Sequence, residues 1–196
     1  MKKQPLILLL LILAAGFQFV VSLSIIYTQE KILKQGIPYR FLIRPIDPAD
    51  PFQGRYLSLG IENDHIPCAD ESGKNLEKNQ TIYAILGTAN GFACFSAWSL
   101  EKPDHGDYFK TRVIEYEDIE DQKIINIKFP FKRFYMEENK APRAERLVRT
   151  NQDSTKCWVT IRFLDGKGAI ENLFINGTPV QELVRKKDKD NQKELK

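Results

Sequence analysis

The chain has 196 residues and a formal net charge of +3, so its positive and negative charges nearly balance. That balance argues against a dedicated nucleic-acid-binding protein, which would carry a strongly basic face. The three cysteines are too few for a disulfide scaffold, no CxxC pair occurs and the two histidines are far apart in sequence, so we expect neither a metal nor another cofactor.

Residues 6–27 form an apolar stretch that no charged residue interrupts, directly after a short basic head. A helix of this length spans roughly 33 Å, against about 30 Å of bilayer hydrocarbon. Two alternatives compete with a permanent anchor. A cleaved signal peptide would use a site ending at Ser24, but the apolar run continues beyond it; a lipoprotein signal would need a cysteine where Phe17 stands. We therefore expect a retained transmembrane helix over residues 6–27.

The orientation of this helix does not follow from a count of positive charges, because Lys2 and Lys3 precede it while Lys31, Lys34 and two arginines follow it. A short basic head followed by a long apolar run is what export machinery recognises, and it favours a cytoplasmic N-terminus. We expect residues 1–5 in the cytoplasm, the helix in the cytoplasmic (inner) membrane and the main domain outside the cytoplasm.

Beyond the apolar stretch the helix is expected to continue to about residue 35 and to stop at Gly36, with Pro38 just after it. Residues 38–183 then show the pattern of a β-rich domain, with short runs of β-branched and aromatic residues separated by Gly, Pro, Asn and Asp. The expected strands are Tyr39–Ile46, Tyr56–Glu62, Thr81–Gly87, Ala93–Leu100, Phe109–Tyr116, Lys123–Phe129, Cys157–Leu164 and Ala169–Ile175.

The predicted fold class is mainly β, with antiparallel sheets arranged as a sandwich or barrel-like pair and one short helix near residues 142–149. In the strand from Cys157, apolar and polar side chains alternate, which is typical of a half-buried antiparallel strand. The sequence Asp165-Gly166-Lys167-Gly168 predicts a hairpin turn, because both glycines tolerate positive φ. Residues 184–196 are so charged that we expect a disordered tail.

Residues 63–80 are polar and predict a long loop. This loop contains Cys68. Outside the cytoplasm, Cys68 and Cys94 are candidates for a disulfide, whereas Cys157, which lies among alternating apolar residues, is expected to be a buried thiol.

The stretch from Arg44 to Leu59 contains three prolines and two Asp-Pro steps, which restrict the backbone and favour turns. One interpretation is a rigid corner between two strands, with Asp47 and Asp50 capping turns. The other is a preorganised loop that presents Arg44, the two aspartates and Arg55 to a ligand or partner. The sequence leaves both open.

The same stretch resembles the signature of the GDYXXLXY family of membrane-anchored bacterial proteins, in which a DPRD-type stretch runs into Gly-Asp-Tyr-x-x-Leu-x-Tyr. Arg55 stands in place of the family's Asp, and Ile61 in place of its final Tyr. The stretch that begins at Arg133 and the one that ends at Gly177 are similar to later blocks of the family. The resemblance implies one N-terminal membrane segment, a domain of this size and a membrane partner, and it carries no established activity. The matching residues are Asp47, Pro48, Asp50, Gly54, Tyr56 and Leu59.

A second candidate group lies at Tyr135, Glu137 and Glu138, with Glu145 on the expected short helix. Two carboxylates about 5–9 Å apart are what a glycoside hydrolase requires. Adjacent residues of a strand face opposite ways, so Glu137 and Glu138 cannot both line one site. Three arginines around Glu145 favour its ionised form, whereas a general acid must stay protonated.

Two functions follow from these observations. The first is a single-pass, membrane-anchored, non-enzymatic protein whose β-rich domain binds an envelope or membrane-protein partner. The alternative is a hydrolase of the cell wall or of another extracytoplasmic polymer that uses paired glutamates. No catalytic residue is assigned and the small-molecule ligand is unknown; the candidate partner-binding residues are Arg44, Asp47, Asp50, Gly54, Arg55, Tyr56, Leu59, Tyr135, Glu137, Glu138 and Glu145.

Overall fold

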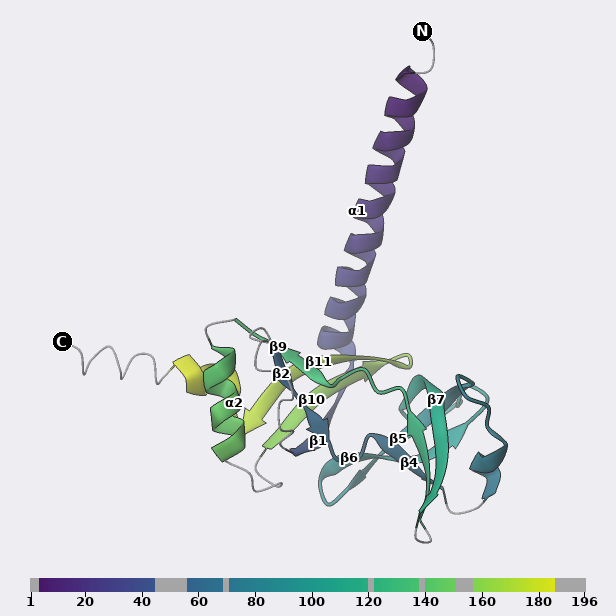
Figure 1. The fold of residues 1–196 in the computed structure, drawn as a ribbon, viewed down its shortest axis with the longest axis vertical. Coiled ribbons are helices and arrows are strands. Elements are labelled where there is room, and N and C mark those ends of the chain that lie inside the picture. The colour runs from purple at the N-terminus through teal and green to yellow at the C-terminus, as the bar shows by residue number, and fades with distance from the viewer. Residues whose placement is uncertain are drawn as a thin grey trace, which may run out of the picture.

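A single long helix stands away from a β-rich body in the computed structural model (Figure 1). The structure describes residues 4–44, 56–68, 71–119, 122–137, 140–150 and 157–185. The helix, α1 (Gln4–Gln35), exposes its apolar side chains from Leu8 to Tyr27 on all sides. By length and composition it is able to cross a membrane once.

The helix ends at Gln35, as the sequence predicts. The Gly36 N–H donates to the Ile32 carbonyl at 2.8 Å and closes the last turn. A Cβ at Gly36 would lie 2.5 Å from that carbonyl oxygen and 3.0 Å from the carbonyl oxygen of Phe163, so only glycine fits this contact. The first strand begins at Ile37, and no linker separates the helix from the body.

Two five-stranded antiparallel sheets make up most of the body, which confirms the mainly β prediction; the described strands form no closed barrel. The first has the order β12-β11-β10-β1-β3 and the second the order β4-β8-β7-β5-β6, while β2 and β9 form a separate ribbon. The strands are β1 (Ile37–Arg44), β2 (Tyr56–Ser58), β3 (Gly60–Ile61), β4 (His65–Cys68), β5 (Thr81–Ala89), β6 (Phe92–Ser99), β7 (Tyr108–Ile119), β8 (Gln122–Ile127), β9 (Arg133–Tyr135), β10 (Cys157–Leu164), β11 (Lys167–Ile175) and β12 (Thr178–Pro179).

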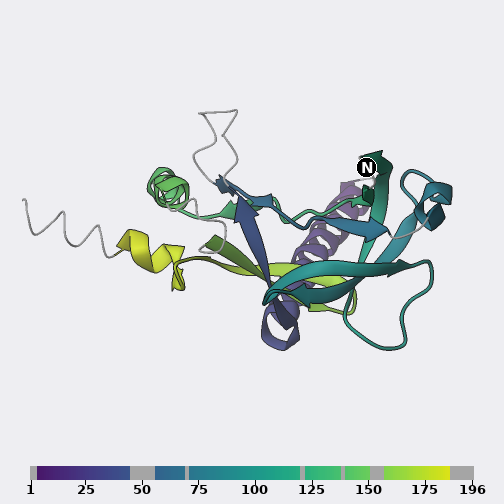
Figure 2. The same ribbon diagram turned by 90° about the horizontal axis from the view of Figure 1, so that it is seen from below.

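Short helices lie at the two ends of the body. Helix α2 (Ala141–Thr150) coincides with the predicted short helix, and a further short helix covers 180–185. The 3-10 helix η1 (Glu71–Asn75) lies at the opposite end (Figures 1 and 2). The helix at 180–185 extends two residues beyond the predicted end of the domain, because Val180 and Val184 are fully buried in the core.

Aromatic rings from both large sheets meet in the core. Phe129, which follows β8, lies between four other rings at centroid distances of 4.9–5.7 Å. Such tilted and edge-to-face contacts add to the stabilisation from apolar burial. The four rings are those of Phe41 in β1, Phe95 in β6, Phe109 in β7 and Phe131.

The predicted hairpin between β10 and β11 is present, but its two glycines have different roles. Asp165 and Gly166 form the two-residue turn, with φ of 50° and 74°. Gly168 lies in β11 without positive φ. A Cβ there would lie 2.6 Å from the ring of Phe131, so this glycine is required by close packing rather than by the turn.

Residues 63–80 are not one long loop, since they contain β4 and η1. Strand β4 pairs with β8 from His65↔Asn126 to Cys68↔Lys123 and buries Ile66 completely. No disulfide joins the three cysteines, all of which lie in described strands. Cys157 is buried, as predicted, and burial raises the pKa of its thiol and of the Cys94 thiol.

A partly buried hydrogen bond joins β1 to the segment before β7: the Tyr39 hydroxyl donates to the Asp107 carboxylate at 2.7 Å. Burial, and then this hydrogen bond, raise the pKa of Tyr39 well above its usual value. In the unfolded chain Tyr39 ionises near pH ~10, so above that pH the unfolded state is favoured and stability is lost. Urea unfolding of Tyr39→Phe should therefore show a shallower loss of stability above pH ~10 and a cost of about 1 kcal/mol at pH ~8. If the free energy of unfolding of Tyr39→Phe fell with pH as steeply as that of the original chain, this role would be contradicted. Tyr135→Phe serves as the control, because the Tyr135 ring is exposed.

Candidate functional site

The ribbon of β2 and β9 places the signature residue Tyr56 directly beside Tyr135, although the two are far apart in sequence. They are register partners in the antiparallel pair, and their ring centroids lie 5.6 Å apart at an interplanar angle of 58°. Both tyrosines are candidates from the sequence, but their contact is not predictable from it. The structure therefore brings together one described residue of each candidate group, Tyr56 and Tyr135.

Alternation along the ribbon separates a core face from an outer face. Leu57 and its register partner Phe134 are 4% and 6% exposed and belong to the core cluster. Leu59, which follows β2, is 1% exposed, and its N–H donates to the Lys132 carbonyl at 2.8 Å. The side chain of this predicted contact residue therefore lies in the core and not on the outer face.

A cation completes the outer face. The guanidinium carbon of Arg133 lies 4.7 Å from the centroid of the Tyr56 ring, within the range of a cation–π interaction. Tyr135 remains 65% exposed beside this pair. We call the side chains of Tyr56, Arg133 and Tyr135 the ribbon face. Tyrosine and arginine are the residue types enriched at the energetic centres of protein interfaces.

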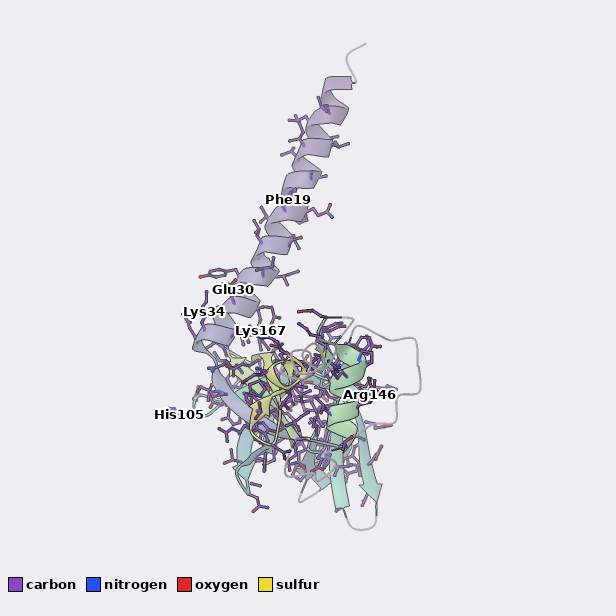
Figure 3. All side chains as sticks on the ribbon, turned by 90° about the vertical axis from the view of Figure 1, so that its left-hand side faces the viewer. Phe19, Glu30, Lys34, His105, Arg146 and Lys167 are labelled. Atoms are coloured by element: carbon purple, nitrogen blue, oxygen red, sulfur yellow. The ribbon has the colours of Figure 1, made fainter. Side chains whose placement is uncertain are left out.

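The chain leaves the ribbon through Glu137 and enters α2. The Glu137 carbonyl accepts the N–H groups of Lys140 and Ala141 at 2.9 and 3.1 Å, and its carboxylate pairs with the Lys140 ammonium at 2.7 Å. Ala144 faces the core and is fully buried. Arg146 lies on the outer side of α2 (Figure 3), where its Nε donates to the Pro142 carbonyl at 3.4 Å. Glu137 and Lys140 thus fix the start of the helix that flanks the ribbon face.

The ribbon and α2 lie to one side of the base of α1 (Figure 1). Helix α2 begins at about the height at which α1 ends, and Figure 3, turned about the same vertical axis, shows the same relation. The ribbon of β2 and β9 therefore lies at the end of the body nearest the apolar part of α1.

Several predicted site residues cannot be placed. Asp47, Asp50, Gly54, Arg55 and Glu138 lie outside the described residues. The backbone of Arg44 ends β1 opposite Gly60 of β3, and Glu145 is a partly buried residue of α2.

Sequence reasoning missed Arg133 and Lys140 as members of the site. Arg133 stands two residues before Tyr135, and side chains two apart on a strand share a face, so the strand period was the available signal. Within the described ranges there is no group of three His, Cys, Asp or Glu side chains placed to hold a metal ion. Nothing in the described part of the chain points to a hydrolase, since the Glu137 carboxylate is engaged by Lys140 at the surface.

Comparison with known proteins identifies a family. The family model described as GDYXXLXY protein matches residues 18–173, a span from the second half of α1 to β11 that includes both strands of the ribbon. No curated protein and no solved structure matches the chain. The matched span covers most of the sequence, and the chain belongs to the GDYXXLXY family.

Proposed function

We propose that this protein is a non-enzymatic module, held at the membrane by α1, whose β-rich domain binds an envelope or membrane-protein partner through the ribbon face. The proposal places α1 in the cytoplasmic membrane with a cytoplasmic N-terminus and the body outside the cytoplasm. The observation that carries it is the exposed Tyr135 ring, 65% accessible, beside the Tyr56–Arg133 pair.

The chemistry of the ribbon face suits a protein partner. Tyrosine offers a large contact area with few rotatable bonds, so little side-chain entropy is lost when it is buried by a partner. Leu57 and Phe134 pack into the core, and these contacts fix the ribbon that carries the rings. Arg133 is already oriented by the Tyr56 ring, and it adds a donor that can pair with a carboxylate or a carbonyl of the partner.

The position of the ribbon face favours a partner that is itself in the membrane. With β1 starting one residue after Gly36, the body cannot move far from the end of α1. Tethering of this kind raises the effective concentration of any partner in the same bilayer. A polytopic membrane protein, whose loops emerge at the same height, fits this geometry.

Tyr135→Ala in the full chain should lower recovery of the partner by about tenfold or more when the tagged protein is purified in mild detergent, because truncation of an interface centre costs about 2 kcal/mol or more. Folding should be unaffected, since the ring is largely exposed. Recovery is measured by mass spectrometry of the eluate, and a photo-crosslinking residue at position 135 should give an adduct in intact cells.

The matched control is Tyr83→Ala, because the chain carries a similar group on its second sheet. There the rings of Tyr83 and Tyr108 lie 5.5 Å apart, and the Lys110 ammonium lies 5.9 Å from the Tyr83 ring. Recovery should persist in this variant. Equal losses in both variants, or isolation of the chain alone under several detergents, would overturn the proposal.

A further inference from the structure

Strand β9 has one edge that no other described element covers. It belongs to a two-stranded ribbon, so β2 is its only strand partner among the described residues. Helix α2 packs against β2, whereas no described helix or strand other than β2 packs extensively against β9. An uncovered edge strand is a template for pairing with a further strand. We call the side of β9 that faces away from β2 the open edge.

The backbone groups at the open edge follow from the register of the ribbon. In an antiparallel pair, residues that bond to the partner strand alternate with residues whose N–H and C=O groups point away from it. The Leu59 N–H donates to the Lys132 carbonyl at 2.8 Å, which fixes the phase of this alternation. Phe134 therefore bonds to β2, whereas the N–H and C=O groups of Arg133 and Tyr135 point to the open edge. Within the described ranges, nothing bonds to these backbone groups at that edge.

This row of backbone groups suits an added strand. The donors and acceptors of Arg133 and Tyr135 alternate over about 7 Å, the spacing of two residues along a strand. In β-strand addition, backbone hydrogen bonds supply affinity and alternate side chains supply specificity. The added residues opposite Arg133 and Tyr135 would lie on the same side of the ribbon as the ribbon face. The added segment would therefore be recognised by its backbone and by two side chains.

Charge at the open edge selects the first of these side chains. Arg133 is exposed, and no carboxylate of a described residue pairs with its guanidinium, which contacts the Tyr56 ring. The Glu137 carboxylate further along the chain is already paired with the Lys140 ammonium at 2.7 Å. A guanidinium binds a carboxylate through charge-assisted hydrogen bonds, so an acidic residue is favoured opposite Arg133. A second copy of this chain would instead bring a second arginine to the same edge, and like charges across a strand pair are unfavourable.

The exposed ring of Tyr135 selects the second side chain. This ring is 65% exposed, so a residue placed opposite it is able to cover it. Aromatic and β-branched residues form favourable cross-strand pairs with a tyrosine. An acidic residue and an aromatic or β-branched residue, two positions apart in an extended segment, thus match the open edge.

We infer that an extended segment of the partner adds to β9 as a third strand of the ribbon, with an acidic residue opposite Arg133 and an aromatic or β-branched residue opposite Tyr135. The inference rests on the proposed function, because it specifies the form in which the partner meets the ribbon face. It also goes beyond that function, since contact through side chains alone requires no free backbone edge.

The test uses the full chain in detergent micelles and a synthetic peptide with blocked ends, Thr-Val-Glu-Val-Tyr-Val-Thr. Saturating peptide should slow amide hydrogen exchange at Arg133 and Tyr135 by about tenfold or more, because their outward N–H groups gain acceptors. Exchange is followed residue by residue by NMR. The N–H of Ser58, which points to the opposite edge of the ribbon, should exchange at an unchanged rate.

Two altered peptides separate the backbone from the side chains. N-methylation of the peptide's glutamate and tyrosine keeps both side chains but removes the N–H groups that would bond to β9. This change should weaken binding by about tenfold or more, because a strand without these donors cannot complete the pairing. Lysine in place of the glutamate keeps the backbone and should also weaken binding by about tenfold, since it faces Arg133.

Proline variants of the chain make the same separation from the other side. Arg133→Ala removes the side chain alone, whereas Arg133→Pro also removes the outward N–H without breaking a hydrogen bond to β2. Arg133→Pro should bind the peptide about tenfold more weakly than Arg133→Ala. Ser58→Pro is the matched control on the opposite edge and should bind as Ser58→Ala does. Melting curves of each variant establish that a lost response is not a loss of folding.

Unchanged exchange at Arg133 and Tyr135, equal binding of the N-methylated peptide, or pairing of two copies of this chain through β9 would each overturn the inference. Its failure differs from failure of the proposed function. If Tyr135→Ala lowers partner recovery while Arg133→Pro and Arg133→Ala recover the partner equally, the ribbon face binds through side chains alone. In that case the proposed function stands and strand addition is wrong.

Discussion

Phe129→Ala should lower the free energy of unfolding by about 3–5 kcal/mol. The ring is 3% exposed and touches rings from both large sheets, with Phe41 at 5.3 Å and Phe109 at 5.7 Å. Truncation removes this shared contact and leaves a cavity that the flanking strands cannot fill without losing their register. Urea unfolding of the full chain in detergent, followed by fluorescence, measures the difference.

The control for this result is Phe92→Ala. Phe92 is partly exposed and makes one ring contact among the described residues, with Trp158. It should cost about 1 kcal/mol. If Phe129→Ala cost no more than this control, the two sheets would not depend on the shared aromatic core, and the sandwich-like packing would have to be revised.

The strands that could be predicted are those whose side chains alternate over many residues. The predicted Cys157–Leu164 coincides with β10, and Thr81–Gly87, Lys123–Phe129 and Ala169–Ile175 differ from β5, β8 and β11 by two residues or fewer at each end. In these segments the local pattern and the buried face agree, so the sequence specifies the element. The turn at Asp165-Gly166 followed from the same local rules.

The elements that were missed are short and depend on tertiary contacts. Strand β4 has four residues, one of them Pro67, and its pairing with β8 is not visible in its own pattern. The expected strand over residues 56–62 is divided in the structure, because β2 pairs with β9 whereas β3 pairs with β1. Local propensity cannot reveal which distant segment a short strand will pair with.

The same distinction applies to the candidate site: single residues could be predicted from the sequence, whereas the contact between them could not. Tyr56 and Tyr135 were each identifiable from the sequence, the first from the signature and the second from its aromatic, charged surroundings. Their contact could not be predicted, since it depends on a register set by Leu57 opposite Phe134. The family resemblance, confirmed by the match over residues 18–173, located the ribbon without indicating its geometry.

Removing residues 1–27 should release the chain from the membrane entirely while leaving the body folded. The side chains of α1 from Leu8 to Tyr27 are exposed and none belongs to the core, whereas Ile32 and Gly36, which contact the body, are kept. Each apolar residue near the centre of a spanning helix contributes about 0.3–0.6 kcal/mol to insertion, so the full stretch makes membrane attachment effectively complete. Carbonate extraction of membranes should leave the full chain in the pellet and the shortened chain in the supernatant.

The full chain also tests the proposed orientation, because protease added to spheroplasts should digest a body that lies outside the cytoplasm. A cytoplasmic protein monitored in the same sample controls for lysis. Protection of the body until detergent is added would place it in the cytoplasm and would exclude any partner outside the cell. Extraction of the full chain by carbonate would show instead that α1 does not span the bilayer, and the ribbon face would then lose the fixed height on which a membrane-protein partner depends.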